Sequence, residues 1–235
     1  VYGLSYTGDL NIGMMDNLLA AGLQISDGCF DLSDNFLSVN RIAPVSPDER
    51  LFVSSNTQSL IAAHEISNIS TVVMSTFASV AGDADGIYYD DANDVLYQLN
   101  RTDNVINAYS NVTDSLAVGS MPMLSATSSS DFSNAREIAV SGSQMVVAQD
   151  ANDGNTNMNR FLIYGISPTS ITINRLYEST INLWGIHADG STLYAIEDNS
   201  NRVAVYLDFF NQTAGSTIVP DASIEVENLV RTHGI

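Results

Sequence analysis

Lysine is absent from this sequence of 235 residues, and its only basic residues besides three histidines are eight arginines. The 27 aspartates and glutamates outnumber them, which gives a net charge of -19 at neutral pH. Recognition of nucleic acids and of anionic membrane surfaces needs clustered cations, so the charge argues against both partners. It favours solubility, divalent cations and cationic partners.

Cysteine is nearly absent as well, since Cys29 is the only one. A single cysteine excludes an internal disulfide and a zinc site built on several thiolates. The neighbouring acids in "SDGCFDLSD" would raise the pKa of a thiol, so we expect a small buried residue rather than a nucleophile. Nucleophile elbows, phosphate-binding glycine loops and HExxH motifs are also missing.

Long hydrophobic runs are lacking, and no apolar stretch approaches the length of a membrane span. The apolar fraction of 45% nevertheless allows a sizeable core, which excludes a disordered acidic chain. The sequence begins at Val1 without a basic and apolar leader, as a mature secreted chain does after signal removal, or a trimmed one. We therefore expect a secreted, extracellular or cell-surface location.

What the sequence does contain is a repeat. An isoleucine recurs in the same phase at spacings of 45, 51, 48 and 49 residues, at Ile42, Ile87, Ile138, Ile186 and Ile235. Each isoleucine lies on a short expected strand, followed by a turn rich in Asp, Gly, Ser or Pro. Constant spacing of this kind indicates a repeat architecture.

Three further strands are expected in each unit. Val, Ile and Tyr dominate them at near period two, as β-strands prefer. The second strands cover 50–54, 95–99, 145–149 and 192–196, and the third strands cover 60–66, 105–110, 161–166 and 203–208. The fourth, weaker strands are expected at 70–75, 115–120, 170–176 and 216–221.

Four strands in each unit of this length are typical of a β-propeller blade. The chain resembles the secreted propellers of the NHL-repeat and lactonase-like group, which carry a "GI" on the innermost strand and an "LY" on the next. Here these pairs are Gly86-Ile87 and Gly185-Ile186, with Leu96-Tyr97 and Leu193-Tyr194. The resemblance implies the architecture and leaves the activity open, because the fold carries many functions.

The two ends of the chain complement each other. "VYGLS" at the start matches a second strand and leads into a third and a fourth, whereas "RTHGI" at the end matches a first strand. The sequence thus predicts an all-β, five-bladed propeller of four-stranded antiparallel blades, with one blade closed by N- and C-terminal strands. The single domain 1–235 divides into blade units 41–81, 82–130, 131–180 and 181–229, with a closing blade of 1–40 plus 230–235.

Three interpretations of this closing blade remain open. The ends can join within one molecule, which satisfies backbone groups that otherwise form open edges. The chain can also be part of a longer one. In the third interpretation "LVRTHGI" completes a blade in a neighbouring molecule and forms a polymer.

Two histidines are the candidates for catalysis. His187 follows the motif Ile186 and His233 precedes Gly234, so both fall on expected inner strands of neighbouring blades. There they can line the channel and bind a divalent metal or act as acid and base. Their positions on opposite sides of the motif isoleucine also fit isolated polar channel residues. His64 takes the place of a third-strand tyrosine, and we expect a structural role for it.

Acidic turns are the candidates for calcium binding, because oxygen-rich loops with glycine supply its ligands. They cover 82–86, 90–94 and 150–157. The third is longest, and Asp150, Asn152 and Asp153 are its expected ligands. Ordinary turn chemistry explains the same composition. Four N-glycosylation sequons, as many as chance supplies, include Asn100 and Asn111, of which Asn100 on a turn is expected to be the most accessible.

Without a catalytic constellation, the sequence favours an extracellular, non-enzymatic module for binding or surface assembly. Its partner would be a protein or carbohydrate at the cell surface, or another copy joined through the terminal strand. The alternative is a lyase or hydrolase with a channel site that uses His187, His233 and a divalent metal.

Overall fold

The computed structural model describes the chain except residues 1, 7–9, 17–23, 32–40, 44–49, 56–59, 69–70, 81, 83, 117–119, 133, 150–158, 168, 198–199, 201, 226–231 and 234–235. The fold is nearly all β, which confirms the expected class. The helical segments among the described residues are α1 (Val112–Leu116), η1 (Ser130–Phe132) and η2 (Phe209–Asn211). None of the described helices has the length and hydropathy that crossing a membrane requires.

The strands of the described residues form five sheets, and within each sheet the strands pair antiparallel except at one added strand. The sheet at the chain ends is β21 (Thr232–His233), β1 (Tyr2–Tyr6), β2 (Leu10–Asp16) and β3 (Gln24–Asp31). The next is β4 (Arg41–Ala43), β5 (Arg50–Ser55), β6 (Leu60–Asn68) and β7 (Thr71–Ser79), followed by β8 (Gly86–Asp90), β9 (Val95–Asn100), β10 (Val105–Ser110) and β11 (Met123–Ser128).

The last two sheets are linked by one strand, β19 (Thr217–Ile218), which pairs with the earlier of the two. One consists of β12 (Ala135–Ser141), β13 (Gln144–Gln149), β14 (Asn159–Ser167), β15 (Ser170–Ser179) and the added β19. The other consists of β16 (Leu183–Asp189), β17 (Thr192–Glu197), β18 (Arg202–Tyr206) and β20 (Ala222–Glu225). In the sequence, β19 lies between β18 and β20, which belong to the last sheet. In space, it pairs with β15 of the sheet before.

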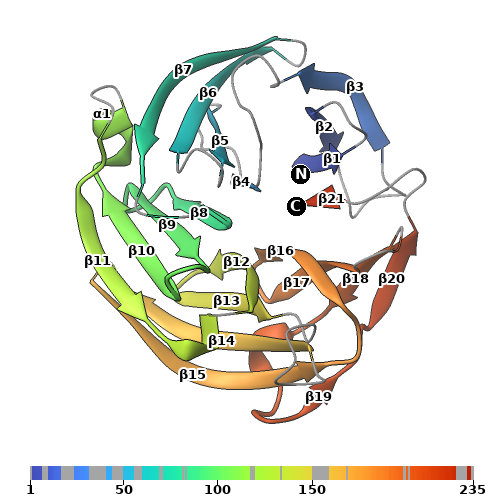
Figure 1. Ribbon diagram of the computed structural model, residues 1–235. Coiled ribbons are helices and arrows are strands. Elements are labelled where there is room, and N and C mark those ends of the chain that lie inside the picture. The colour runs from blue at the N-terminus through green and yellow to red at the C-terminus, as the bar shows by residue number, and fades with distance from the viewer. Residues whose placement is uncertain are drawn as a thin grey trace.

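The sheets stand around a common centre, where both chain ends lie (Figure 1). Strand β4 contacts β8, β8 contacts β12, β12 contacts β16, and β16 contacts β21. Strand β21 pairs with β1, with Leu4 opposite His233 and Ser5 opposite Thr232. Strands from the two ends of the chain thus lie in one sheet.

The motif isoleucines lie on the innermost strands. Ile42 is on β4, Ile87 on β8, Ile138 on β12 and Ile186 on β16. The last three are 2%, 2% and 3% exposed. Ile235 lies outside the described residues. The repeat therefore reflects one buried position on each inner strand, at which burial selects a β-branched residue.

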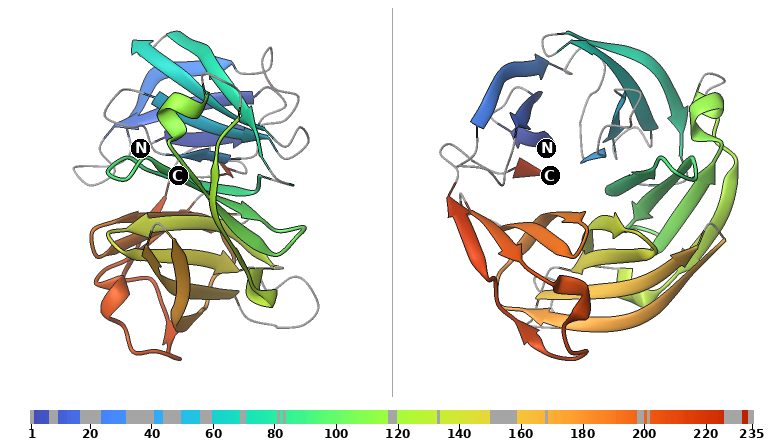
Figure 2. Two further views of the ribbon diagram at one scale, coloured as in Figure 1. Left: turned by 90° about the vertical axis from the view of Figure 1, so that its left-hand side faces the viewer. Right: turned by 180° about the vertical axis from the view of Figure 1, so that it is seen from behind.

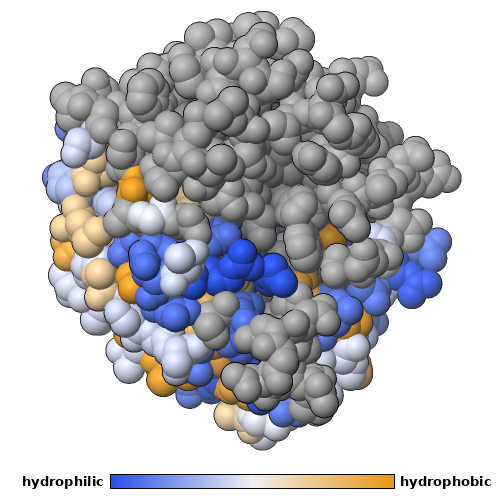
Figure 3. Space-filling model, viewed as in Figure 1, coloured by the Kyte–Doolittle hydropathy of each residue, from blue (hydrophilic) through white to orange (hydrophobic). Residues whose placement is uncertain are grey.

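The hydrophobic core is divided among layers between successive sheets. One cluster joins Phe52 of β5 to Leu96 of β9, and a second joins Tyr97 of β9 to Met145 of β13. A third joins Phe161 of β14 to residues of the last sheet. On the face seen in Figure 3, hydrophilic residues gather toward the centre and the hydrophobic residues are scattered. Packing of sheet on sheet, rather than one central core, holds this fold together.

Gly86 on β8 illustrates how closely the inner strands approach. A Cβ at this position would lie 2.8 Å from Oε1 of Glu137 and 3.1 Å from the backbone nitrogen of Ile138, both on β12. Glu137 is 2% exposed, so its side chain has little room to move. The glycine of the "GI" pair therefore permits β8 and β12 to pack together.

Substituting Gly86→Ala is expected to lower the free energy of unfolding by about 1–3 kcal/mol, because the new methyl group overpacks this contact. Gly165→Ala is the matched control, since its Cβ would meet only the end of the exposed Asn174 side chain, at 2.9 Å. Urea denaturation of both variants measures the difference. Equal stabilities for the two variants would show that β8 and β12 are not packed in this way.

Two expected fourth strands are wrong. Residues 115–120 were expected to form one, but residues 115 and 116 belong to helix α1, residues 117–119 lie outside the described residues, and the fourth strand is β11, farther along. Asn111, with a φ of 50°, turns the chain out of β10, and Asp94 Oδ1 accepts the backbone N–H of Thr113 at 3.1 Å. Residues 216–221 contain β19, and the fourth strand of that sheet is β20.

The segment between β18 and β20, residues 207–221, is here called the crossing segment. It carries η2 and then β19, which pairs parallel to β15 with Thr217 opposite Glu178 and Ile218 opposite Ser179. Both views in Figure 2 place this segment at the rim, away from the centre where the termini lie. A backbone segment of one sheet thus extends the outer edge of its neighbour.

Candidate functional site

His187, the first catalytic candidate, lies on β16 and is partly buried. Burial lowers the pKa of its imidazole, and the carboxylate of Asp189 opposes that effect. Its ring centroid lies 6.4 Å from that of Tyr194 on the neighbouring β17. The imidazole is therefore biased toward its neutral form, which can accept a proton or bind a metal.

The strands of the two candidate histidines are neighbours, because β16 contacts β21 and β21 carries His233. His233 is placed by its strand, and its side chain lies outside the described part of the structure. Among the described residues no group of three or more His, Cys, Asp or Glu side chains is arranged to hold a metal ion. The expected calcium ligands Asp150, Asn152 and Asp153 lie outside the described residues.

Asp94 organises the described acidic turn at 90–94. Its Oδ1 accepts hydrogen bonds from the hydroxyls of Tyr89 at 2.9 Å and Thr113 at 2.6 Å. In the same turn Nδ2 of Asn93 donates to Oδ2 of Asp90 at 2.7 Å. These contacts connect the hairpin of β8 and β9 to α1, so this turn uses its carboxylates for local structure.

The acidic turn at 82–86 is also tied to its surroundings. Asp85 is 6% exposed and lies 3.7 Å from the guanidinium of Arg101, whose backbone N–H donates to Asp85 Oδ2 at 3.2 Å. Gly82 has a φ of 66°, and Nδ2 of Asn100 occupies the space that a Cβ would need. Local hydrogen bonds within the turns therefore explain the acidic composition of 82–86 and 90–94 without a bound calcium ion.

The two glycosylation candidates differ in exposure. Asn100 is 1% exposed, its Nδ2 donates to Asp103 Oδ2 at 2.8 Å, and its Oδ1 accepts the Asp103 N–H at 3.1 Å. Asn111 is exposed. The expectation that Asn100 is the most accessible sequon is therefore wrong for the folded chain, whereas glycosylation at Asn100 or Asn111 stays a prediction.

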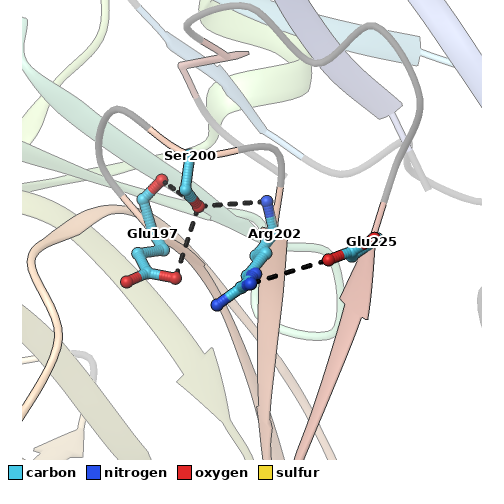
Figure 4. A network of polar contacts seen from close by, with 4 residues as sticks. All are labelled: Glu197, Ser200, Arg202 and Glu225. Carbon is cyan, nitrogen blue, oxygen red and sulfur yellow. Dashed lines mark hydrogen bonds and ion pairs between the residues drawn. The ribbon is translucent and has the colours of Figure 1, made fainter.

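A polar turn closes the hairpin of β17 and β18 (Figure 4). Ser200 Oγ donates to the backbone oxygen of Glu197 at 3.2 Å and accepts the N–H of Arg202 at 3.1 Å. The Arg202 guanidinium lies 3.6 Å from the carboxylate of Glu225 on β20, and both side chains are mostly exposed. Exposed ion pairs of this kind contribute little to stability.

The crossing segment encloses a pocket of about 290 Å³, here called the rim pocket. Its apolar lining includes Leu207 and Val219, which are 53% and 64% exposed at its mouth. Its polar lining includes Thr213, Ser216 and Asp221. The rim pocket thus combines exposed aliphatic side chains with hydroxyls and one carboxylate.

Aromatic packing holds the rim pocket in place. Phe209 of η2 is 0% exposed and meets Phe161 and Tyr177 of the neighbouring sheet edge-on, with ring centroids 5.1 Å and 5.3 Å apart. The Tyr177 hydroxyl donates to the backbone oxygen of Gln212 at 3.0 Å, and Arg175 donates to that of Phe210. The crossing segment is therefore fixed to β15 by both burial and hydrogen bonds.

Sequence reasoning missed the rim pocket because it expected an ordinary turn and a fourth strand there. The available signal was the pair Phe209-Phe210 directly after a strand, where a polar turn normally follows. Two bulky aromatics in a turn need a surface to bury against, and only a segment that crosses to a neighbouring sheet supplies one.

Buried tyrosines predict a loss of stability in alkali. Burial raises the pKa of Tyr206 to about 12, and burial together with the hydrogen bond to Asp94 raises that of Tyr89 to about 12. Tyrosines of the unfolded chain ionise near pH ~10, so above that pH the unfolded state releases protons that the folded state keeps. The free energy of unfolding should therefore fall as the pH rises from about 10 to about 12.

Circular dichroism and tyrosinate absorbance, recorded together during an alkaline titration, measure this effect. The part of the tyrosinate signal that comes from buried rings should appear together with the loss of β structure. Complete tyrosine ionisation with the fold intact would contradict the prediction.

No protein-family model and no curated protein matches the sequence. Chains of solved structures do match its fold. A chain of a nidogen–laminin complex has a TM-score of 0.57 at 10% identity, and the match covers 99% of this chain and 96% of that one. The fold is β-propeller-like.

Two bacterial structures share the fold. A candidate 6-phosphogluconolactonase of Bacteroides uniformis has a TM-score of 0.58 at 13% identity, with 98% of this chain and 69% of that chain covered. Glutaminyl cyclase of Myxococcus xanthus has a TM-score of 0.56 at 11% identity, with 80% and 70% covered. At such identities the likeness concerns the fold alone, and neighbours that include enzymes and a protein complex indicate no common activity.

Proposed function

We propose that the chain is a five-bladed β-propeller that serves as an extracellular, non-enzymatic binding module. The blades are units 41–81, 82–130, 131–180 and 181–229, and the closing blade joins 1–40 to 230–235. Five sheets, the contacts between successive inner strands and the pairing of β21 with β1 support the architecture. In the third interpretation, the terminal strand β21 of one molecule would pair with β1 of another in the same register.

A cysteine cross-link distinguishes closure within one molecule from exchange. Leu4 and His233 face each other across β1 and β21, so cysteines at both positions, with Cys29→Ser to remove the native thiol, can form a disulfide. We expect a cross-linked monomer on oxidation at low concentration, with the Leu4→Cys single variant as control. Disulfide-linked dimers and larger species would instead support the polymer.

The rim pocket is the observation that carries the binding function. Leu207 and Val219 line it with exposed side chains on a frame of packed sheets, where they can supply apolar contact area beside polar groups. The strongly acidic, lysine-free composition adds long-range attraction for a cationic partner. We favour a protein partner over a carbohydrate because Phe209 and Tyr206, the aromatic lining residues, are buried and offer no stacking face.

Binding of the purified chain to an array of extracellular proteins and glycans tests this function. We expect saturable binding to proteins with basic surfaces, and weaker binding as the salt concentration rises above about 0.15 M, where charge attraction is screened. A chain with Leu207→Ser and Val219→Ser should lose this binding while keeping its fold. Retention only on glycans, or on no surface, would contradict the proposal.

The channel enzyme remains a second candidate because β16 and β21, which carry His187 and His233, contact each other. In that case the neutral imidazole of His187 would act as a base or a ligand to a divalent metal. Metal analysis of the purified chain and assays of ester and lactone hydrolysis test this candidate. Turnover that depends on metal and is lost in His187→Gln would favour the enzyme over the binding module.

A further inference from the structure

The two sides of the rim pocket offer different chemistry. Leu207 and Val219 contribute exposed apolar side chains to its lining, and Phe209 and Ile218 contribute buried ones. These four side chains form an aliphatic and aromatic path into the pocket. A long, unbranched hydrocarbon stem matches such a path, because it buries apolar area along its whole length.

Asp221 supplies the charge of the pocket. Among the lining residues that the structure describes, it alone is charged at neutral pH. Its Oδ2 accepts the backbone N–H of Leu207 at 2.7 Å. Asp221 is exposed, so its carboxylate can meet a cationic side chain that enters from solvent, and the compact ammonium group of lysine needs only one of its oxygens.

Hydroxyl groups provide further acceptors for an ammonium group. Thr213 and Ser216 line the pocket, and the Ser216 hydroxyl donates to the Thr213 backbone oxygen at 2.6 Å, so its lone pairs face outward from that bond. Lysine carries three donors on one nitrogen and requires several acceptors when it is partly desolvated. The combination of one carboxylate and neighbouring hydroxyls meets that need.

The walls of the pocket are preformed. Asp221 N–H donates to the Val205 oxygen at 2.9 Å, Gly215 N–H donates to the Leu176 oxygen at 2.8 Å, and Glu178 N–H donates to the Ser216 oxygen at 3.0 Å. The crossing segment is thus attached to β15 and to β18 on its two sides. A site that is already ordered loses little conformational entropy when a ligand enters.

We propose that the rim pocket binds the side chain of a lysine on a partner protein, which rests on the proposed binding function and names its recognition chemistry. The partner is a different protein, because this chain contains no lysine. Its charge of -19 also repels a second copy and attracts a basic partner. The stem of the lysine lies between Leu207 and Val219, and its ammonium group meets Asp221.

A peptide titration followed by NMR tests the site directly. The probes are a short blocked peptide with one lysine and the same peptide with acetyl-lysine or norleucine, which keep the stem and lose the charge. We expect saturable shifts at the amides of Leu207, Val219 and Asp221, and a dissociation constant about twofold to fivefold lower for the lysine peptide, as an exposed ion pair allows.

Two variants separate the pocket charge from the general charge. Asp221→Asn keeps an oxygen that can accept the Leu207 N–H but removes the charge, and should weaken lysine-peptide binding about twofold to fivefold. Asp208→Asn is the matched control, since Asp208 lies in the same segment, accepts from Asn211 Nδ2 at 2.5 Å and does not line the pocket. It should leave binding unchanged.

Three results would overturn the proposal. The first is equal affinity for the lysine and norleucine peptides. The second is an equal loss of lysine-peptide affinity in Asp221→Asn and Asp208→Asn. The third is that unlabelled chain, added in place of the peptide, produces the same NMR shifts. Array binding that persists in Asp221→Asn would remove the lysine site and leave the binding function standing. If the chain binds the lysine peptide but retains no protein on the array, the lysine site stands and the proposed binding function is contradicted.

Discussion

Replacing Phe209 with alanine is expected to lower the free energy of unfolding by about 3–5 kcal/mol, the usual cost of deleting a buried phenylalanine side chain. Phe209 is 0% exposed, and its ring meets those of Phe161, Tyr177, Tyr206 and Phe210 at centroid distances of 5.1 to 6.1 Å. Urea denaturation, followed by circular dichroism, measures the loss.

The control for this substitution is Val219→Ala in the same crossing segment. Val219 is 64% exposed, so its truncation should change the free energy of unfolding by no more than about 0.5 kcal/mol. A small loss in Phe209→Ala, comparable with that control, would mean that the crossing segment does not bury its aromatics against β14 and β15.

Deleting residues 231–235 is expected to cost at least about 3 kcal/mol, a large share of the 5–15 kcal/mol typical of folded domains. The deletion removes β21 and leaves the β1 edge without its partner at Leu4 and Ser5. It also removes the strand that contacts β16. Calorimetry of the deleted chain should show a lower melting temperature.

His233→Ala is the control for the deletion, because it keeps the backbone that pairs with β1 and should change stability little. A synthetic peptide of residues 227–235, added to the deleted chain, should restore part of the lost stability in a concentration-dependent way. A deleted chain as stable as the intact one would rule out a structural role for β21.

The architecture was readable from the sequence because one physical requirement recurs in every unit. Ile87, Ile138 and Ile186 are all buried on inner strands, so burial at one repeated position imposes the period. The second and third strands followed from alternating Val, Ile and Tyr residues, and their observed bounds agree with the expected ranges to within one or two residues. Both signals are local and strong.

The fourth strands were less readable because they lie at the outer edges. The pattern on β11 is largely exposed, so burial imposes little alternation there, and the helix α1 depends on Asp94, a residue far away in sequence. A parallel pairing such as that of β19 with β15 leaves no local pattern at all. The rim pocket follows from that pairing, and the pair Phe209-Phe210 was the local signal for it.

The candidate histidines were predictable only as strand positions. Their placement one residue after and two residues before the motif isoleucine put them on inner strands, and the contact between β16 and β21 agrees with neighbouring placement. The partial burial that lowers the pKa of His187 depends on packing across sheets. No sequence pattern reports such packing.

Because the crossing segment belongs to one sheet and pairs with the other, the last two sheets cannot separate without breaking it. In repeat architectures, each unit otherwise interacts with its neighbours only through the layer between them. Here a backbone connection and the buried Phe209 add to that layer. Residues 135–225 should therefore behave as one cooperative unit, whose backbone amides open to hydrogen exchange together and separately from those of β8 to β11.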